Sequence, residues 1–126
     1  MSPGLGPSDM RSAMKLLLAI VNTDLLDELR DRLFEIGAPG LTVDGVIGIG
    51  KPLSQMRYSE QRGFIPRFFA RSRVEIVVED SRVDELVAVV QQVCRTGRTG
   101  DGKIFVLPVD QVVRIRTGEE GQKALY

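Results

Sequence analysis

The sequence predicts an α+β fold in which a strand–helix–strand unit occurs twice. Asp27-Glu28-Leu29 recurs as Asp84-Glu85-Leu86, each one turn into a helical pattern that follows an apolar strand pattern and precedes a glycine. Residues 50–71, which have no clean periodicity, join the two units between their central strands. The resulting order, βαββαβ, predicts a ferredoxin-like sandwich with a long loop between its second and third strands.

The first unit begins with a continuous apolar run at residues 15–21, the pattern of a strand buried on both faces. Asn22-Thr23-Asp24 then supplies helix-starting side chains, and Gly37 is placed to end the helix. A second strand is predicted over residues 41–49. The apolar stripe of the helix has spacings of three and four and consists of Leu26, Leu29, Leu33 and Ile36.

The second unit repeats this plan with a strand at residues 72–79 and a helix that starts at Asp80-Ser81. A glycine-rich loop then leads to a strand at residues 104–107 and a shorter extended piece at residues 112–116. The stripe of this helix consists of Val83, Leu86, Val87, Val90 and Val93.

We expect residues 14–117 to form one folded domain. Residues 1–13 are predicted to be a disordered N-terminal extension, and residues 118–126, which are polar, a flexible C-terminal tail. In the predicted fold both helices cover one face of the sheet, while the other face carries apolar residues. Exposed apolar surface of that extent needs a partner, so the sequence predicts an oligomer.

The composition excludes several classes of protein. The chain has 17 basic and 17 acidic residues, which argues against attraction of the whole molecule to nucleic acid or membrane. It has no histidine, which excludes imidazole zinc sites and histidine bases. The single cysteine, Cys94, suits a reducing compartment and reads as a small core residue. Without a signal-peptide pattern or the ~20 apolar residues of a membrane span, we expect a cytoplasmic protein with no membrane insertion.

The loop at residues 96–103 carries the clearest chemistry. Its glycines at 97, 100 and 102 let backbone N–H groups converge on an oxygen-rich ligand, and Lys103 adds a positive charge. Arg114 and Arg116, two residues apart, would point to one side of a strand. Together these features predict a polyphosphate site, and the other interpretation of the loop is a plain glycine-rich turn between a helix and a strand. A P-loop is rejected because Ile104 stands where magnesium needs Ser or Thr, and no helix follows.

Two motifs carry a family resemblance: Thr96-x-x-x-Gly100-Asp101-Gly102-Lys103-Ile104-Phe105-Val106, then Val113-Arg114-Ile115-Arg116-Thr117-Gly118-Glu119. From Met14 onward the chain resembles the nitrogen regulatory P-II signal-transduction family. The resemblance implies a homotrimer with its sheets packed inward. It also implies ATP or ADP, with AMP as a further candidate, in a cleft between neighbouring subunits. The nucleotide-binding residues that it implies are Gly40, Leu41, Thr42, Gly50, Lys51, Val77, Thr96, Gly100, Asp101, Gly102, Lys103, Arg114 and Arg116.

Residues 50–71 match the family's T-loop, the arm that contacts target proteins, but their content is atypical. Pro52 replaces the glutamine that chelates magnesium and contacts 2-oxoglutarate, which counts against 2-oxoglutarate sensing and leaves magnesium open. Phe64 and Arg62 stand where other members carry a modified tyrosine or serine, so tyrosine modification is not expected unless Tyr58 substitutes. Arg71 keeps the charge of the lysine that binds the oxoacid, which makes it a candidate anion or effector residue.

Cations and aromatic rings alternate along this loop, which predicts a surface that docks an acidic or amphipathic partner. The other interpretations are a solvated loop with a few packed phenylalanines and a site for a small anion. By resemblance the target is a transporter, an enzyme or a transcription factor. The candidate partner-binding residues are Arg57, Tyr58, Arg62, Phe64, Arg67, Phe68 and Phe69.

The favoured interpretation is a regulator that binds ATP or ADP and controls a target through the T-loop. The alternative is a diverged P-II-like sensor of another small anion, such as bicarbonate, or of a cyclic nucleotide. Residues 62–69 and 103–106 echo the two motifs of an RNA-recognition module, but in reversed order, and Pro66 breaks the first. For these reasons we do not expect a nucleic-acid-binding protein. No nucleophile–base pair emerges from the spacing, so we do not expect an enzyme.

Overall fold

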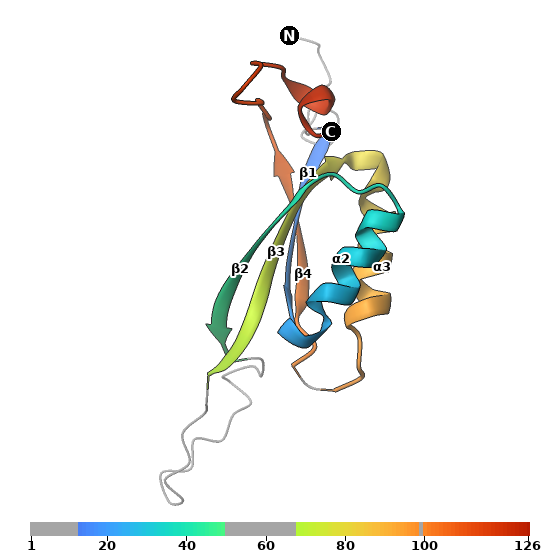
Figure 1. Cartoon of the computed structure of the whole chain (residues 1–126), viewed down its shortest axis with the longest axis vertical. Coiled ribbons are helices and arrows are strands. Elements are labelled where there is room, and N and C mark those ends of the chain that lie inside the picture. The colour runs from blue at the N-terminus through green and yellow to red at the C-terminus, as the bar shows by residue number, and fades with distance from the viewer. Residues whose placement is uncertain (1–12, 50–67, 99) are drawn as a thin grey trace, which may run out of the picture.

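The structure is a computed structural model that describes residues 13–49, 68–98 and 100–126. Within these ranges, four strands form one antiparallel sheet in the order β2-β3-β1-β4. Both α-helices lie on the same face of this sheet (Figure 1), which confirms the predicted ferredoxin-like fold. The elements are β1 (Met14–Val21), η1 (Thr23–Leu25), α2 (Leu26–Glu35), β2 (Leu41–Gly48), β3 (Phe69–Glu79), η3 (Asp80–Arg82), α3 (Val83–Cys94), β4 (Lys103–Val109) and η4 (Gly121–Ala124).

The core lies between the helices and the two central strands. Alternate residues of β1 and β3 point toward the helices and are buried, as the two-residue period of a strand requires. The predicted helical stripes meet them there, with Leu29 and Leu33 of α2 and Leu86 of α3 at most 1% exposed. Cys94 joins this cluster, as expected of a small core residue. The buried cluster consists of Leu17, Ala19, Val21, Leu29, Leu33, Val74, Ile76, Val78, Leu86, Val89, Val90, Val93 and Cys94.

The opposite face of the sheet is not covered by any part of the chain that the structure describes. Leu16 and Leu18 of β1 are only half-buried, so the prediction that this strand is buried on both faces was wrong for one protomer. Leu16 pairs with Leu107 and Leu18 with Phe105, and residues paired across an antiparallel sheet share a face. Phe105 is 48% exposed. An apolar strip therefore runs along the uncovered side of β1 and β4.

Two further departures from the predicted elements concern the ends of strands. β3 begins at Phe69, three residues before the expected start. The extended piece expected at residues 112–116 is absent, because Ile115–Thr117 form a turn and Val113 makes only an isolated bridge with Glu120. Gly118 closes that turn by donating its N–H to the Arg114 carbonyl at 2.8 Å, with a positive φ of 75°. The chain therefore doubles back on itself after β4.

Residues 118–126, expected to be a flexible tail, contain η4 and make side-chain contacts with the end of β3. The Tyr126 hydroxyl lies 2.5 Å from Oε1 of Glu79, and Gln122 donates to the other oxygen of that carboxylate at 3.2 Å. Figure 1 shows this segment (red) at the end of the molecule opposite the glycine loop. In the described part of the chain, no helix is long and apolar enough to cross a membrane.

Candidate functional site

The glycine loop between α3 and β4 is shaped by one carboxylate. Asp101 Oδ2 accepts from the backbone N–H groups of Thr96 at 2.8 Å and Gly97 at 2.9 Å. Its Oδ1 accepts from the Thr96 hydroxyl at 2.5 Å. These three hydrogen bonds lower the pKa of Asp101, and the bond from the Thr96 hydroxyl has the largest effect. Asp101 and Thr96, both predicted to bind nucleotide, thus bind each other and fix the curvature of the loop.

Three glycines give the loop its backbone conformation, as predicted. Gly97, Gly100 and Gly102 have φ of 83°, 99° and 100°, a region that other residues avoid. Gly102 has a second reason to be glycine, since an added Cβ would lie 1.7 Å from the backbone oxygen of Ile20. The loop therefore packs against the end of β1 without room for any side chain at this position.

Lys103 and Arg71 both lie at this end of the sheet. Lys103 begins β4 and is exposed, and its side chain makes no hydrogen bond or ion pair with any residue that the structure describes. Arg71, near the start of β3, places Nη2 3.0 Å from where a Cβ of Gly100 would stand. Its guanidinium also lies 5.5 Å from the ring centroid of Phe69. The strand β3 thereby brings Arg71 against the glycine loop, from which it is 29 positions away in the sequence.

A hollow of about 380 Å³ opens beside the glycine loop, between α3 and the end of β1. Its walls are largely apolar, and Lys103 and Arg95 add positive charge to its lining. Burial raises the pKa of the Cys94 thiol to about 11, so this wall carries no reactive thiolate at neutral pH. The lining residues are Ile20, Val21, Val87, Val90, Gln91, Cys94, Arg95, Asp101, Gly102, Lys103 and Ile104.

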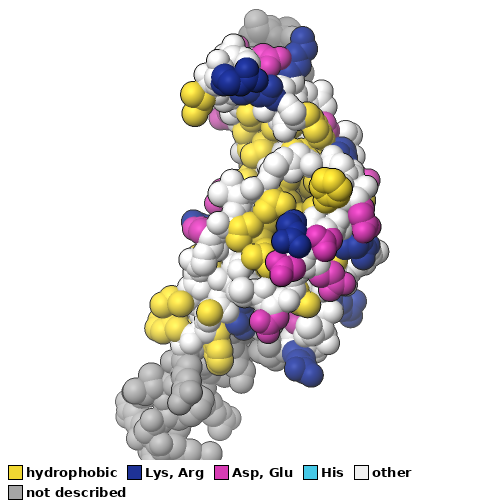
Figure 2. Space-filling view, viewed as in Figure 1, with side chains coloured by type: hydrophobic (Ala, Val, Ile, Leu, Met, Phe, Trp, Pro, Cys, Tyr) yellow, Lys and Arg dark blue, Asp and Glu magenta, His cyan; other side chains and the backbone are white. Residues whose placement is uncertain are grey.

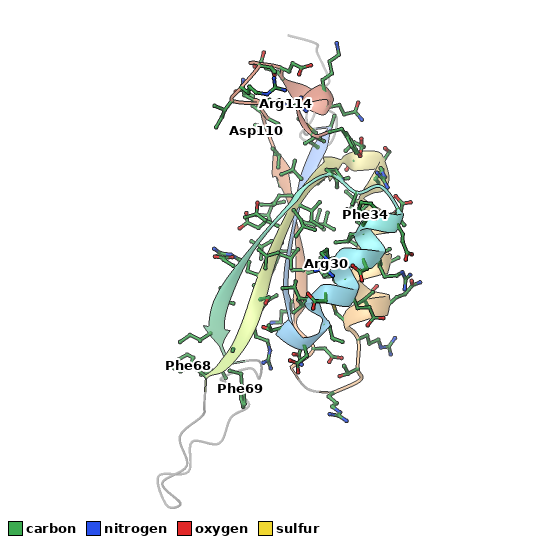
Figure 3. All side chains as sticks on the ribbon, viewed as in Figure 1. Arg30, Phe34, Phe68, Phe69, Asp110 and Arg114 are labelled. Atoms are coloured by element: carbon green, nitrogen blue, oxygen red, sulfur yellow. The ribbon has the colours of Figure 1, made fainter. Side chains whose placement is uncertain are left out.

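Arg114 and Arg116 lie at the other end of the molecule. Figure 3 shows Arg114 beyond the far end of β4, beside Asp110 and η4. Arg114 pairs with Glu119 at 3.2 Å and donates to the backbone oxygens of Lys123 and Tyr126. Arg116 is exposed and makes no side-chain bond to any residue in the described ranges. Because a turn replaces the expected strand here, the two arginines differ in surroundings instead of forming a matched pair.

The residues matched to the adenine pocket lie on β2, the opposite edge strand of the sheet, and on its neighbour β3. Gly40 precedes β2, and Leu41 and Thr42 begin it. Thr42 pairs with Glu75 of β3, and Val77 lies two residues further along the same face of β3. This edge also carries a smaller apolar groove of about 140 Å³ between α2 and β2. Figure 2 shows hydrophobic side chains gathered there, next to Arg30, which Figure 3 labels.

The predicted nucleotide-binding residues are therefore not together within one chain. β4 has seven residues, so Lys103 and Val109 are about 20 Å apart, and Arg114 lies further on. β2 is three strand spacings from β4, which separates Thr42 from Lys103 by about 14 Å across the sheet. Gly50 and Lys51, like the loop residues Arg57, Tyr58, Arg62, Phe64 and Arg67, lie outside the described residues. Phe68 and Phe69 are exposed at the start of β3 (Figure 3).

A family model described as "Nitrogen regulatory protein P-II" matches residues 14–119 of this chain. The chain belongs to the P-II family. It is 41% identical to the nitrogen regulatory protein P-II of Azospirillum brasilense over 112 residues, which cover 89% of this chain and all of that protein. The family assignment confirms the resemblance inferred from the glycine loop and the arginine motif, and makes this protein a P-II regulator.

Solved P-II structures have the same fold. The B. subtilis GlnK–ATP complex is 32% identical with a TM-score of 0.76, covering 90% of this chain and 98% of that one. Arabidopsis thaliana PII bound to citrate is 37% identical with a TM-score of 0.74, covering 90% and 91%.

Sequence reasoning missed one cluster in this P-II protein. Arg82 donates to the backbone oxygens of Ile36 and Gly37, which end α2, and to the Tyr126 hydroxyl at 3.0 Å. The pKa of Arg82 is raised, first by the hydrogen bond to Tyr126 and then by that to Glu85. No sequence motif signals these contacts, because they join three segments that are distant in sequence. Within the described residues, no group of three or more acidic or cysteine side chains could hold a metal ion.

Proposed function

We propose that this protein is a cytoplasmic, homotrimeric P-II regulator that binds ATP or ADP between protomers and controls a target protein through residues 50–71. The observation that carries the proposal is the division of the phosphate-binding cations between the two ends of one chain. Lys103 and the glycine loop lie at one end, and Arg114 and Arg116 lie beyond the other. One protomer can supply only half of a triphosphate site.

A second copy of the chain supplies the other half if it contacts the first head to tail. Such a heterologous contact pairs two different surfaces and closes into a ring when the rotation allows it. The uncovered apolar strip on β1 and β4 gives the ring a surface to bury. A trimer is the smallest ring of this kind beyond a dimer, and it is the assembly that the family resemblance implies.

At the joined site the cations would act on the phosphates. Lys103, Arg114 and Arg116 would make charge-assisted hydrogen bonds, while the N–H groups of Gly100 and Gly102 line the bend of the loop. Gly40, Leu41, Thr42 and Val77 would contact the base. The similarity to a GlnK–ATP complex over 90% of this chain supports a nucleotide as the ligand.

The nucleotide would act by shifting the conformations of residues 50–71, through contacts that differ between ATP and ADP. Arg71 connects that segment to the site, since its guanidinium lies against Gly100. This is the chemistry of a regulator that responds to ligand binding.

A second candidate function rests on the same arginine. Arg71 faces the glycine loop, and its only side-chain hydrogen bond to a described residue is to the Ala70 carbonyl at 2.9 Å. A free guanidinium edge of this kind suits a carboxylate. The A. thaliana PII bound to citrate shows that a similar chain holds a small polycarboxylate, and supports a small anion as an additional or alternative ligand. Bicarbonate and a cyclic nucleotide are further candidate ligands to be tested in the same way.

Calorimetry with ATP and ADP tests the proposal. We expect micromolar binding to the wild type, and a loss of at least about tenfold in Arg116→Ala and in Lys103→Ala, because each removes charge-assisted bonds to phosphate. Arg32→Ala is the matched control, since Arg32 lies on α2, lines neither hollow, and has side-chain contacts with Gln92 and Glu35 among the described residues. Absence of ATP and ADP binding to the wild type, or equal loss in the control, would refute the proposal.

A further inference from the structure

The C-terminal segment, residues 118–126, occupies one of the arginines assigned to phosphate. Nη1 of Arg114 donates to Oε1 of Glu119 at 3.2 Å. Nη2 donates to the backbone oxygen of Lys123 at 3.1 Å and also to that of Tyr126. Arg114 is accordingly only 28% exposed, whereas Arg116 is exposed and unbonded within the described ranges.

The same segment is anchored to the body of the protein by its last residue. The Tyr126 hydroxyl lies between Glu79 Oε1, at 2.5 Å, and Arg82 Nη1, at 3.0 Å. Glu79 ends β3, and Arg82 is fixed by its bonds to the carbonyls that end α2. Gln122 adds a bond to Glu79 at 3.2 Å. The anchor thus rests on rigid elements, and it holds the backbone oxygens of residues 123 and 126 over Arg114.

The oxygens around Arg114 resemble an anion in chemistry. One carboxylate and two carbonyl oxygens use both terminal nitrogens of the guanidinium, which are the donors that a phosphate would use in a forked contact. A phosphate and residues 119–126 cannot both hold these donors. Forked binding of a phosphate to Nη1 and Nη2 of Arg114 therefore requires the segment to move away.

We propose that residues 118–126 are an internal competitor for Arg114, held closed by the Tyr126 hydroxyl, and that nucleotide phosphate displaces them. The inference rests on the proposed function and adds a regulatory contact to the same site. When the segment is closed over Arg114, fewer chains can bind nucleotide phosphate. The apparent affinity for nucleotide falls in proportion to the fraction of chains that can bind. In the reverse direction, bound nucleotide frees the segment and the carboxylate of Glu79.

Calorimetry on Tyr126→Phe tests the competition, because this change removes the hydroxyl and keeps the ring. We expect ATP to bind about threefold to tenfold more tightly than to the wild type. In an Arg114→Ala background the same change should have no effect, since the group competed for is gone. Lys123→Arg is the control, because the Lys123 side chain makes no bond to a described residue and its charge is kept. Glu79→Gln, at the other end of the anchor, is a second variant expected to tighten binding.

Hydrogen exchange supplies a readout that is independent of affinity. Amides of residues 118–126 should exchange faster in ATP-saturated wild type than in the free protein. If the wild type binds ATP but Tyr126→Phe binds equally or more weakly, or if exchange in this segment does not rise, the competition is refuted while the proposed function stands. If neither protein binds ATP, the proposed function fails and the inference with it.

Discussion

Asp101 is the residue that holds the glycine loop in its curved form. Three donors converge on its carboxylate, one hydroxyl and two backbone N–H groups, all from residues four or five positions before it. The pattern of glycines predicted the loop, but it did not predict this role for Asp101. Which donors a carboxylate selects depends on the conformation that the loop adopts, and spacing alone does not determine that conformation.

The protonation of Asp101 should affect stability at acid pH. Because its folded pKa is lowered, mainly by the Thr96 hydroxyl, its contribution is fully present above the unfolded pKa of about 3.9 and is lost as the pH falls through the folded value. We expect Asp101→Asn to be less stable than the wild type near neutral pH, with a difference that shrinks below about pH 4. Urea unfolding at one protein concentration across this range measures the difference. If the difference in unfolding free energy between the two proteins stays constant down to about pH 3, the carboxylate charge is not the cause of that difference.

The helices and strands were predicted more completely than the segments that connect them. Leu29, Leu33, Leu86 and Val90 all lie in the core, because a helix that covers a sheet must place apolar residues every three or four positions. The return turn after β4 was missed. Its position depends on contacts such as that of Tyr126 with Glu79, 47 positions away, which local periodicity does not record.

The contact between the glycine loop and β1 gives a prediction for these elements. Gly102→Ala should destabilise the protein by about 2 kcal/mol or more, since it combines a positive φ with a Cβ placed on the Ile20 oxygen. Gly45→Ala on β2 is the matched control, because nothing lies within 4 Å of its Cβ position. We expect it to be neutral or slightly stabilising. Denaturant unfolding measures both, and equal stability of the two variants would contradict the close approach.

At the scale of the whole molecule, the sequence predicts which residues form the site but not how far apart they lie in one chain. Lys103 and Arg116 are 13 positions apart in the sequence, yet β4 carries them to different ends of the sheet. A linear pattern does not distinguish residues that meet within a protomer from residues that meet across an interface. The proposed requirement for a second copy is supported by the uncovered strip of β1 and β4 and by the separated cations, which are independent observations.

Subunit complementation tests this requirement most directly. Lys103→Ala and Arg116→Ala chains are unfolded together, refolded at equal amounts, and compared with each variant refolded alone. In a head-to-tail trimer with random mixing, about a quarter of the interfaces join an intact Lys103 to an intact Arg116. Calorimetry should therefore recover about a quarter of the wild-type number of ATP sites, at wild-type affinity, in the mixture only. If the mixture recovers none while the wild type binds ATP, the site is not shared between protomers and the account is wrong.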